Sequence, residues 1–515
     1  MIHRFGGRFY FAGSILFFFV SAALSAYFYL FVKDNLFDDV FIYANIAQNA
    51  VEHGTWRYFP FVPRDALLAS SPLKVTLLTA SYALIALFHS ARSVFTVNLT
   101  IFISGLLSIL LFLPAWRKNL TMFLFLGGVF FISSLVYIAS LDFEGGLLFL
   151  WLSTLLHLMQ NPKRGGGFLL SLYILIGIFI RPDCALIVYA CLFVYVISSK
   201  RYDIFLNVRF VCSGVAIALA WLALAYSMGV YPLPVTYWGK ASLPRLVENT
   251  AMIQHFIPRL GEKLLPRLDN AAVTTTFSLA IVCLICGLSA SRSRYAQFLL
   301  FPAVILTALL LIKLPSSFHW YYENFIFLGL AILFSNFAVA RMPSDIVTKY
   351  SSALIAFTMV VPALMLTGVS SQRSPWSFKS ETRSQSYLYI ARHATGHGTY
   401  NLPGLGEVLI KNPEIGITSY FSGKGGWIWD SASLAQPLDA PEVQQSKLQY
   451  LYPLALRQTA LADAKWIAQK AGKPLPAYEV WAMDNRDFED ARKKCAYVNE
   501  EGALCANPSG IVDPL

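Results

Sequence analysis

Runs of about 20 apolar residues recur along this chain and constrain its fold more than any other feature. A helix of about 20 apolar residues spans the hydrocarbon core of a bilayer. The 515 residues are 56% hydrophobic and only 13% charged, too apolar for a soluble protein of this size. We therefore predict an all-α polytopic membrane bundle with about eleven transmembrane helices. The predicted spans are residues 9–32, 94–115, 119–139, 144–159, 167–181, 184–199, 208–227, 271–289, 296–313, 324–340 and 350–369.

The distribution of Lys and Arg predicts the orientation of these spans. Short cytoplasmic loops hold an excess of Lys and Arg, and with a cytoplasmic N-terminus the alternate loops comply. The cytoplasmic bases are then Arg4, Arg8, Arg117, Lys118, Lys163, Arg164, Lys200, Arg201, Arg209, Arg292, Arg294, Arg341 and Lys349. The net charge of +11 therefore reports orientation and gives no support for binding to nucleic acid. We predict a multi-pass protein of the bacterial inner membrane.

An odd number of spans places the polar tail outside the cytoplasm. We therefore divide the chain into a transmembrane domain, residues 1–370, and a periplasmic C-terminal domain, residues 371–515. In the tail, short apolar runs such as Gly416–Gly423 and Trp427–Asp430 alternate with Gly and Pro and predict strands and turns. Apolar residues at helical spacing predict helices in 441–491. The tail is thus predicted to be a small α/β domain.

Two of the seven cysteines, Cys495 and Cys505, lie in this exported tail. The periplasm is oxidising, and the two residues are close in sequence, so we predict a disulfide between them. Two free thiols are the alternative, and the mass with and without reductant distinguishes the two states.

The long loop between the first two spans, residues 33–93, predicts two helices at the membrane surface. Apolar residues recur at helical spacing from Asp38, and Gly54 is the expected stop. Ser71-Pro72 then supplies a capping residue followed by Pro at the first helical position, which opens a second helix over Leu73–Phe88. Such amphipathic helices lie in the membrane interface.

Two adjacent carboxylates, Asp38 and Asp39, open the first of these helices. Charges near hydrocarbon are costly, which favours a role in binding or proton transfer over packing. A carboxylate is a common general base for a hydroxyl. Neighbouring helical residues point about 100° apart, so one carboxylate can face a cavity while the other caps the helix or binds a cation. The alternative is that both only stabilise the helix dipole.

Other outside loops contain the remaining ionisable and aromatic candidates. The cations suited to a lipid phosphate are Arg57, Arg64, Arg181, Lys240 and Arg245. For Arg181, snorkelling at a helix end beside Asp183 is an equal alternative. Asp142 and Glu144 are candidate ligands, with the acidic pair, for a divalent cation (Mg²⁺, Mn²⁺ or Ca²⁺). His319 and Trp320 begin an aromatic cluster that predicts either a membrane belt or sugar stacking.

Five short segments, in order along the chain, resemble a known family. They are Asp38-Asp39-Val-Phe-Ile-Tyr, Asp142-Phe-Glu144, Arg181-Pro-Asp183, Leu233-Pro-Val-Thr-Tyr237-Trp-Gly-Lys240, and Ser419-Tyr-Phe-Ser-Gly423 with the later Asp430. They are similar to motifs of GT-C type integral-membrane glycosyltransferases, in the branch containing the mycobacterial terminal arabinofuranosyltransferase. Asp142 stands where that branch often has Gly, and the segment after Gly54 lacks its Tyr-Thr-Asn-type continuation.

The resemblance implies an inverting transfer of a sugar, such as the pentose arabinofuranose, from a polyprenyl-phosphate donor. Asp38 or Asp39 would deprotonate a hydroxyl of the acceptor, a cell-envelope glycan or a surface glycoprotein. The substrate-binding candidates are Arg57, Glu144, Arg181, Asp183, Tyr237, Lys240, His319 and Trp320, with Asp142 for a metal. A ligase or polymerase of lipid-linked glycans is the nearest alternative. A transporter fits less well, because it should show internal repeats and charges near the middle of the bilayer.

Overall fold

The computed structural model describes residues 2–31, 38–58, 65–69, 71–89, 91–117, 119–136, 144–160, 162–180, 208–234, 387–396, 398–412, 415–423, 428–430, 472, 475–482, 495–498 and 504–508. The chain forms two compact units. The first, here called the helical unit, comprises Met1–Phe31, Ile101–Ala220 and Leu243–Ser377. The second, the mixed unit, comprises Val32–Thr100, Trp221–Ser242 and Phe378–Leu515.

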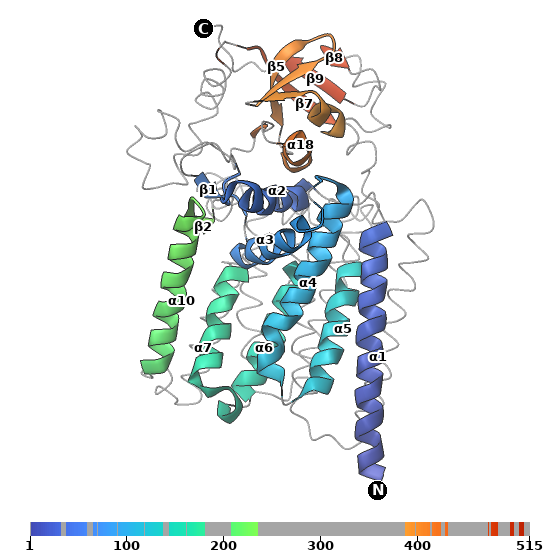
Figure 1. The fold of residues 1–515 in the computed structure, drawn as a ribbon, viewed down its shortest axis with the longest axis vertical. Helices are drawn as coiled ribbons and strands as arrows, with labels where there is room; N and C mark the ends of the chain where they lie inside the picture. Colours follow the sequence, from blue (N-terminus) through green and yellow to red (C-terminus); the bar gives the residue numbers. More distant parts are fainter. Residues whose placement is uncertain are drawn as a thin grey trace, which may run out of the picture. The chain divides into compact units, whose positions relative to one another are not determined.

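Long apolar helices build the helical unit (Figure 1). Its described helices coincide with the predicted spans, and two of them, α4 and α10, also contribute residues to the mixed unit. They are α1 (Ile2–Phe31), α4 (Val94–Trp116), α5 (Leu120–Val136), α6 (Glu144–Gln160), α7 (Pro162–Ile180) and α10 (Val208–Ser227). Glycines let neighbours approach closely: a Cβ built on Gly128 of α5 would lie 2.4 Å from Phe17 of α1. The other predicted spans lie outside the described residues.

Among the residues that the structure describes, α4 alone has both the length and the apolar character of a membrane span, with a mean hydropathy of 2.2. Shorter apolar helices cover Phe11–Tyr27, Pro72–Ala86, Leu120–Phe131, Glu144–Leu158, Leu169–Ile180 and Val211–Ser227. The count of about eleven spans therefore stays a prediction.

The two helices predicted in the loop after α1 are confirmed. The first is α2 (Asp38–His53), and Gly54 follows it with a φ of +67°, a conformation that glycine adopts without steric cost. The second is α3 (Pro72–Ala86), with Pro72 in its first turn. The Ser71 side chain accepts a hydrogen bond from the backbone N–H of Lys74 and caps this helix. Local signals thus set the C-terminal end of α2 and the N-terminal end of α3.

A short parallel ladder ties this loop to the segment after α10. Strand β1 (Asp65–Leu67) pairs with β2 (Val230–Pro234). Beside it, the Thr55 Oγ1 and the Trp56 backbone N–H both donate to the carbonyl of Met228, at 2.7 and 2.9 Å. Two segments far apart in sequence therefore form one part of the mixed unit.

A mixed sheet of seven strands forms the C-terminal part of the mixed unit. The strand order is β3-β4-β5-β7-β9-β8, with β6 also pairing with β5. The β5–β7 and β5–β6 pairs are parallel, and the others are antiparallel. The strands are β3 (Ala394–Gly396), β4 (Thr399–Leu402), β5 (Gly406–Asn412), β6 (Trp429–Asp430), β7 (Ala477–Ala482), β8 (Tyr497–Val498) and β9 (Leu504–Pro508).

Two predictions for the tail are wrong in detail. Gly416–Ser422 forms helix α18 instead of a strand, although its β-branched and aromatic residues have weak helix propensity; packing decides its conformation. Ala477–Ala482, inside the region predicted to be helical, is strand β7. Pro474 and Pro476 are incompatible with a continuing helix, so a helix cannot run through this part of the predicted region. The rest of 441–491, except residues 472, 475 and 476, lies outside the described residues.

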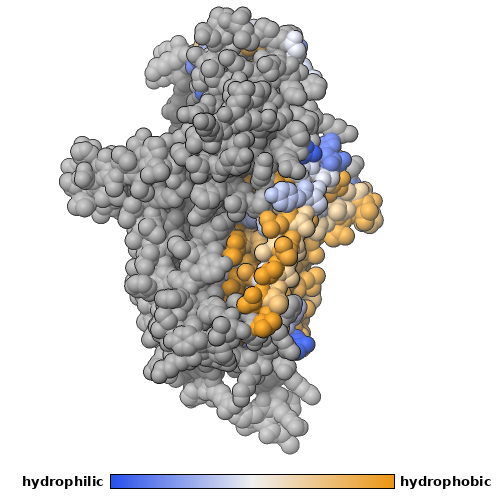
Figure 2. Space-filling model, turned by 90° about the vertical axis from the view of Figure 1, so that its left-hand side faces the viewer, coloured by the Kyte–Doolittle hydropathy of each residue, from blue (hydrophilic) through white to orange (hydrophobic). Residues whose placement is uncertain are grey.

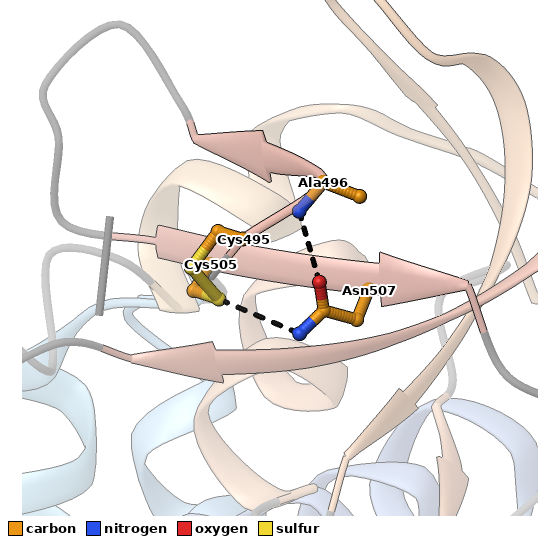
Figure 3. Close-up of a disulfide and its surroundings, with 4 residues drawn as sticks. All are labelled: Cys495, Ala496, Cys505 and Asn507. Carbon is orange, nitrogen blue, oxygen red and sulfur yellow. Dashed lines mark hydrogen bonds between the residues drawn. A yellow bond between two sulfur atoms is a disulfide. The ribbon is translucent and has the colours of Figure 1, made fainter. Parts of the chain in front are cut away.

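The predicted pair Cys495 and Cys505 is joined by a disulfide in the structure (Figure 3). Cys505 lies on β9 and Cys495 just before β8, so the bond closes the β8–β9 hairpin. Asn507 supports the pairing of the same strands, because its Oδ1 accepts a hydrogen bond from the Ala496 backbone N–H at 2.9 Å. Its Nδ2 lies 3.9 Å from the Cys505 Sγ.

Candidate functional site

The acidic pair occupies the first two positions of α2. Residues three, four and seven apart share a face of an α-helix. Asp38 therefore shares its face with Phe41 and Asn45, while Asp39 shares its face with Tyr43. Acidic residues in this first turn are also stabilised by the helix dipole. The two carboxylates thus start two adjoining faces of α2, and each face has different neighbours.

A buried ammonium lies on the Asp39 face. The Lys74 Nζ lies 3.5 Å from the centre of the Tyr43 ring, and Lys74 is only 1% exposed. The Tyr43 hydroxyl accepts a hydrogen bond from the Ser71 backbone N–H at 2.9 Å. An ammonium is costly to bury, and the ring below it offsets part of that cost. The second turn of α2 and the first turn of α3 are thereby fastened together, with a positive charge against the face of α2 that begins with Asp39.

An arginine connects three segments on the other side of α2. Arg92, just before α4, donates from Nη1 to the Asn45 Oδ1 at 3.2 Å and to the Tyr420 carbonyl at 2.9 Å. Its Nη2 forms an ion pair with the Glu52 Oε2 at 2.8 Å. The Arg92 side chain is only 13% exposed. One guanidinium therefore joins two turns of α2 to α18, using the planar fork of donors that distinguishes Arg from Lys.

The Arg92 guanidinium also determines the charge state of Glu52. Burial acts to raise the pKa of this carboxyl, but the hydrogen bond and the positive charge of Arg92 outweigh it. The Gln48 side chain adds a second hydrogen bond, at 2.7 Å. The pKa of Glu52 consequently lies below its ordinary value of 4.5, so the ion pair is intact at neutral pH.

Buried tyrosines hold α18 against the two loop helices. The Tyr420 hydroxyl is 2.8 Å from the Tyr82 hydroxyl of α3. The Tyr58 hydroxyl donates to the Ile415 carbonyl at 2.9 Å and also contacts Ser419 Oγ. Burial raises the pKa of Tyr420 to about 12 and raises that of Tyr82 well above 10. Both hydroxyls therefore stay protonated at physiological pH, and the bond between them persists.

Besides the acidic pair, the structure describes two of the predicted site residues, Arg57 and Glu144. Arg57 lies in the mixed unit, half-buried, with its Nε donating to the Thr55 Oγ1 at 2.7 Å. Glu144 is the first residue of α6, in the helical unit. The other predicted residues lie outside the described part of the chain; they are Asp142, Arg181, Asp183, Tyr237, Lys240, His319 and Trp320.

Sequence reasoning missed Lys74 and Arg92 as site residues. Lys74 is the only Lys or Arg among the buried residues of the described chain. The signal for it was a lone base one turn after the Ser71-Pro72 cap, within an apolar segment. Arg92 had no such local signal, because its partners on α2 and α18 are distant in sequence. Among the described residues, no group of three His, Cys, Asp or Glu side chains is placed to hold a metal ion.

Comparison with known proteins gives one structural match to report. No protein-family model matches the chain, and no curated protein matches it. The crystal structure of ArnT from Cupriavidus metallidurans, bound to undecaprenyl phosphate, matches with 14% sequence identity and a TM-score of 0.49. The match covers 98% of this chain and 99% of that chain.

Proposed function

We propose that this protein is an inverting glycosyltransferase that moves a sugar from a polyprenyl-phosphate donor to a hydroxyl on the outer face of the bacterial inner membrane. One observation carries the proposal. An acidic pair opens α2, the next described helix after the apolar α1, and Lys74 is buried against Tyr43, on the face of α2 that begins with Asp39. A carboxylate and a fixed cation are the two charges that such a transfer requires.

Each charge has a defined role in the proposed reaction. One carboxylate of the pair accepts the proton of the acceptor hydroxyl, whose oxygen forms the new bond to the anomeric carbon. The bond from that carbon to the phosphate oxygen breaks, and the lipid phosphate leaves with the electron pair. Lys74, with Arg57 as a second candidate, stabilises the negative charge on the leaving phosphate. No nucleotide is needed.

The exposed apolar surface supports two parts of the proposal, a lipid-linked donor and a location in the membrane. Among the described residues, exposed apolar side chains form a patch on the face drawn in Figure 2. Along α10, these exposed apolar residues are Val208, Val211, Val215, Leu219 and Leu222. The end of α3 exposes Leu84, Leu87 and Phe88, the last of them 89% exposed. Large exposed apolar patches mark membrane or partner contacts, and a polyprenyl chain has the same chemistry.

The proposed topology has the N-terminus in the cytoplasm and residues 371–515 in the periplasm. The basic cytoplasmic loops support this orientation. The disulfide between Cys495 and Cys505 supports it independently, because such bonds persist in oxidising compartments. A reporter fused after Ser371 should be active only when it is exported.

The resemblance of the five segments to the arabinofuranosyltransferase branch supports a finer proposal. The donor sugar is a pentose such as arabinofuranose, and the acceptor is a cell-envelope glycan or a surface glycoprotein. The matched residues Glu144, Arg181, Asp183, Tyr237 and Lys240 are proposed to bind these substrates, together with Arg57 and with His319 and Trp320 of the aromatic cluster. Asp142 is proposed to bind a divalent cation, Mg²⁺, Mn²⁺ or Ca²⁺.

The test measures transfer from polyprenyl-phosphate arabinofuranose by the purified protein in lipid nanodiscs. Removing the general base should lower the turnover by at least about 100-fold, so Asp38→Asn or Asp39→Asn should abolish most activity. Lys74→Met should slow release of the lipid phosphate. The charge-matched control is Glu407→Gln, which alters an acid on β5 of the C-terminal sheet and should retain full activity.

Two results would contradict these assignments. Full activity in both Asp variants would refute the role of the pair as a base. Failure of the wild-type protein to release polyprenyl phosphate from any of a panel of lipid-linked pentoses and hexoses would refute the reaction class.

A further inference from the structure

We propose that α18 is a positioning element for the acidic helix: it holds the face of α2 that begins with Asp38. This inference rests on the proposed function, because positioning has a catalytic consequence only if α2 carries the general base. It gives a role to the Tyr420-Phe421 segment of the tail, to which the proposed reaction assigns none.

Aromatic contacts bring α18 to the first turn of α2. The Phe41 ring lies 5.6 Å from the Tyr420 ring and 5.5 Å from the Phe421 ring, between ring centres. Phe41 is 3% exposed, and Tyr420 is fully buried. Phe41 is three residues after Asp38, within one helical turn of 3.6 residues. A shift of α18 would therefore be transmitted to the turn that carries the carboxylate. Figure 1 shows α18 beside α2.

Polar contacts fasten the same face farther along α2. Asn45 and Glu52 are seven and fourteen residues after Asp38, which places them on its side of the helix. Both bind the Arg92 guanidinium, which also holds the Tyr420 carbonyl. The face that begins with Asp38 is therefore connected to α18 in its first turn by rings and in its later turns by one arginine.

The hydroxyls of Tyr58 and Tyr82 fix α18 from two further segments. Tyr58 binds the Ile415 carbonyl and Ser419 at the start of α18, and Tyr82 of α3 binds the Tyr420 hydroxyl. Buried hydrogen bonds of this kind specify one arrangement, because an alternative packing would leave polar groups without partners. A misplacement of about 1 Å can cost roughly 100-fold in rate, so this rigidity matters for a general base.

The experiment compares two substitutions that weaken different parts of the mixed unit. Phe421→Leu removes the ring contact with Phe41 but keeps an apolar side chain. Val480→Ala truncates a fully buried residue of the C-terminal sheet and serves as the control for general destabilisation. Phe421→Tyr keeps the ring and should restore the wild-type properties. Turnover, the KM for polyprenyl-phosphate arabinofuranose, the melting temperature and amide hydrogen exchange of residues 38–45 are measured for each protein.

We expect Phe421→Leu to lower kcat by roughly tenfold, to leave the donor KM within about twofold and to speed amide exchange in 38–45. Val480→Ala should lower the melting temperature without either effect. The inference is overturned if kcat falls in step with melting temperature in both variants, or if Phe421→Leu leaves exchange in 38–45 unchanged.

The exchange measurement separates this inference from the proposed function. If the wild-type protein transfers no sugar, the proposed function fails, while the exchange rates still show whether α18 holds α2. If transfer occurs and Phe421→Leu alters neither kcat nor exchange, the positioning role alone fails.

Discussion

The helical unit and the mixed unit differ in how far apart in sequence their hydrogen-bonded partners lie. In α4 of the helical unit, the Ser104 and Ser108 hydroxyls donate to carbonyls three and four residues earlier in the same helix. In the mixed unit, by contrast, the Tyr58 hydroxyl reaches a carbonyl 357 residues away. The helical unit also has hydrogen bonds between helices, such as the one from the Tyr173 hydroxyl to the Leu111 carbonyl, 62 residues away. Those that join α18 to the rest of the mixed unit link segments hundreds of residues apart.

This difference indicates which contacts set the geometry of each unit. The helices of the helical unit are in addition closely packed, as where Gly177 of α7 lies against the ring of Trp151 of α6, whose Nε1 donates to the Tyr173 carbonyl. The mixed unit joins loop, helix and sheet through directional hydrogen bonds and one disulfide. In the helical unit, substitutions that change side-chain volume should therefore lower stability most. In the mixed unit, the largest losses should follow the removal of hydrogen bonds or of the disulfide.

The largest effect on stability should follow removal of the disulfide, and it should be confined to the mixed unit. Closing a loop between residues ten apart stabilises a fold by about 3 kcal/mol. The double substitution Cys495→Ser with Cys505→Ser should lower the unfolding free energy of the mixed unit by that amount, measured by protease susceptibility of the tail. Cys212→Ser, at a free and exposed cysteine of α10, is the control. Equal destabilisation of both units would contradict the claim that the disulfide stabilises the mixed unit alone.

The second effect is steric and belongs to the helical unit. A Cβ at Gly177 would lie 2.1 Å from the Trp151 ring, and Trp151 is fully buried. Overpacking of this kind costs about 1–3 kcal/mol, so Gly177→Ala should lower the melting temperature. Gly13→Ala is the matched control, because a Cβ there has no atom within 4 Å. If both variants melt alike, close packing does not hold this unit together.

The smallest effect is electrostatic and should appear only at acidic pH. Because the pKa of Glu52 is lowered in the fold, its pairing with Arg92 contributes stability above pH 4.5, and this is lost as the pH falls through the lower folded value. Solvent exposure limits the contribution to about 1 kcal/mol or less. Melting temperatures between pH 6 and pH 3 should therefore fall less steeply in Glu52→Gln than in wild type. Parallel curves would show that the pair adds nothing.

Local signals predicted the elements around the site well. The Ser71-Pro72 cap and the Gly54 stop are written into consecutive residues, so the ends of α2 and α3 followed from capping chemistry. Apolar runs of helical length likewise located α4 and α6, because such runs have few other stable conformations in a membrane. The Asp38-Asp39 pair was found because two charges beside an apolar span are costly.

The contacts that join these elements could not be predicted from the sequence, because they form between segments that are distant along the chain. Helix α18 has only seven residues, too few to be stable alone, so its conformation depends on the helices it packs against. Arg92 and Tyr420 come together only through folding, and no spacing between them predicts it. The capped helix α3 was predictable, whereas the burial of Lys74 in it depended on the position of Tyr43 on α2.

The contacts between α18 and the loop helices can form only late in synthesis, because α18 lies near the end of the chain. The ribosome makes Tyr58 first and Ile415 357 residues later, and at about 5–20 residues per second that interval is roughly 20–70 s. During that time the acidic helix exists without the segment that completes its surroundings. A chain that stops before Ile415 therefore leaves α2 without the contacts that α18 makes to it.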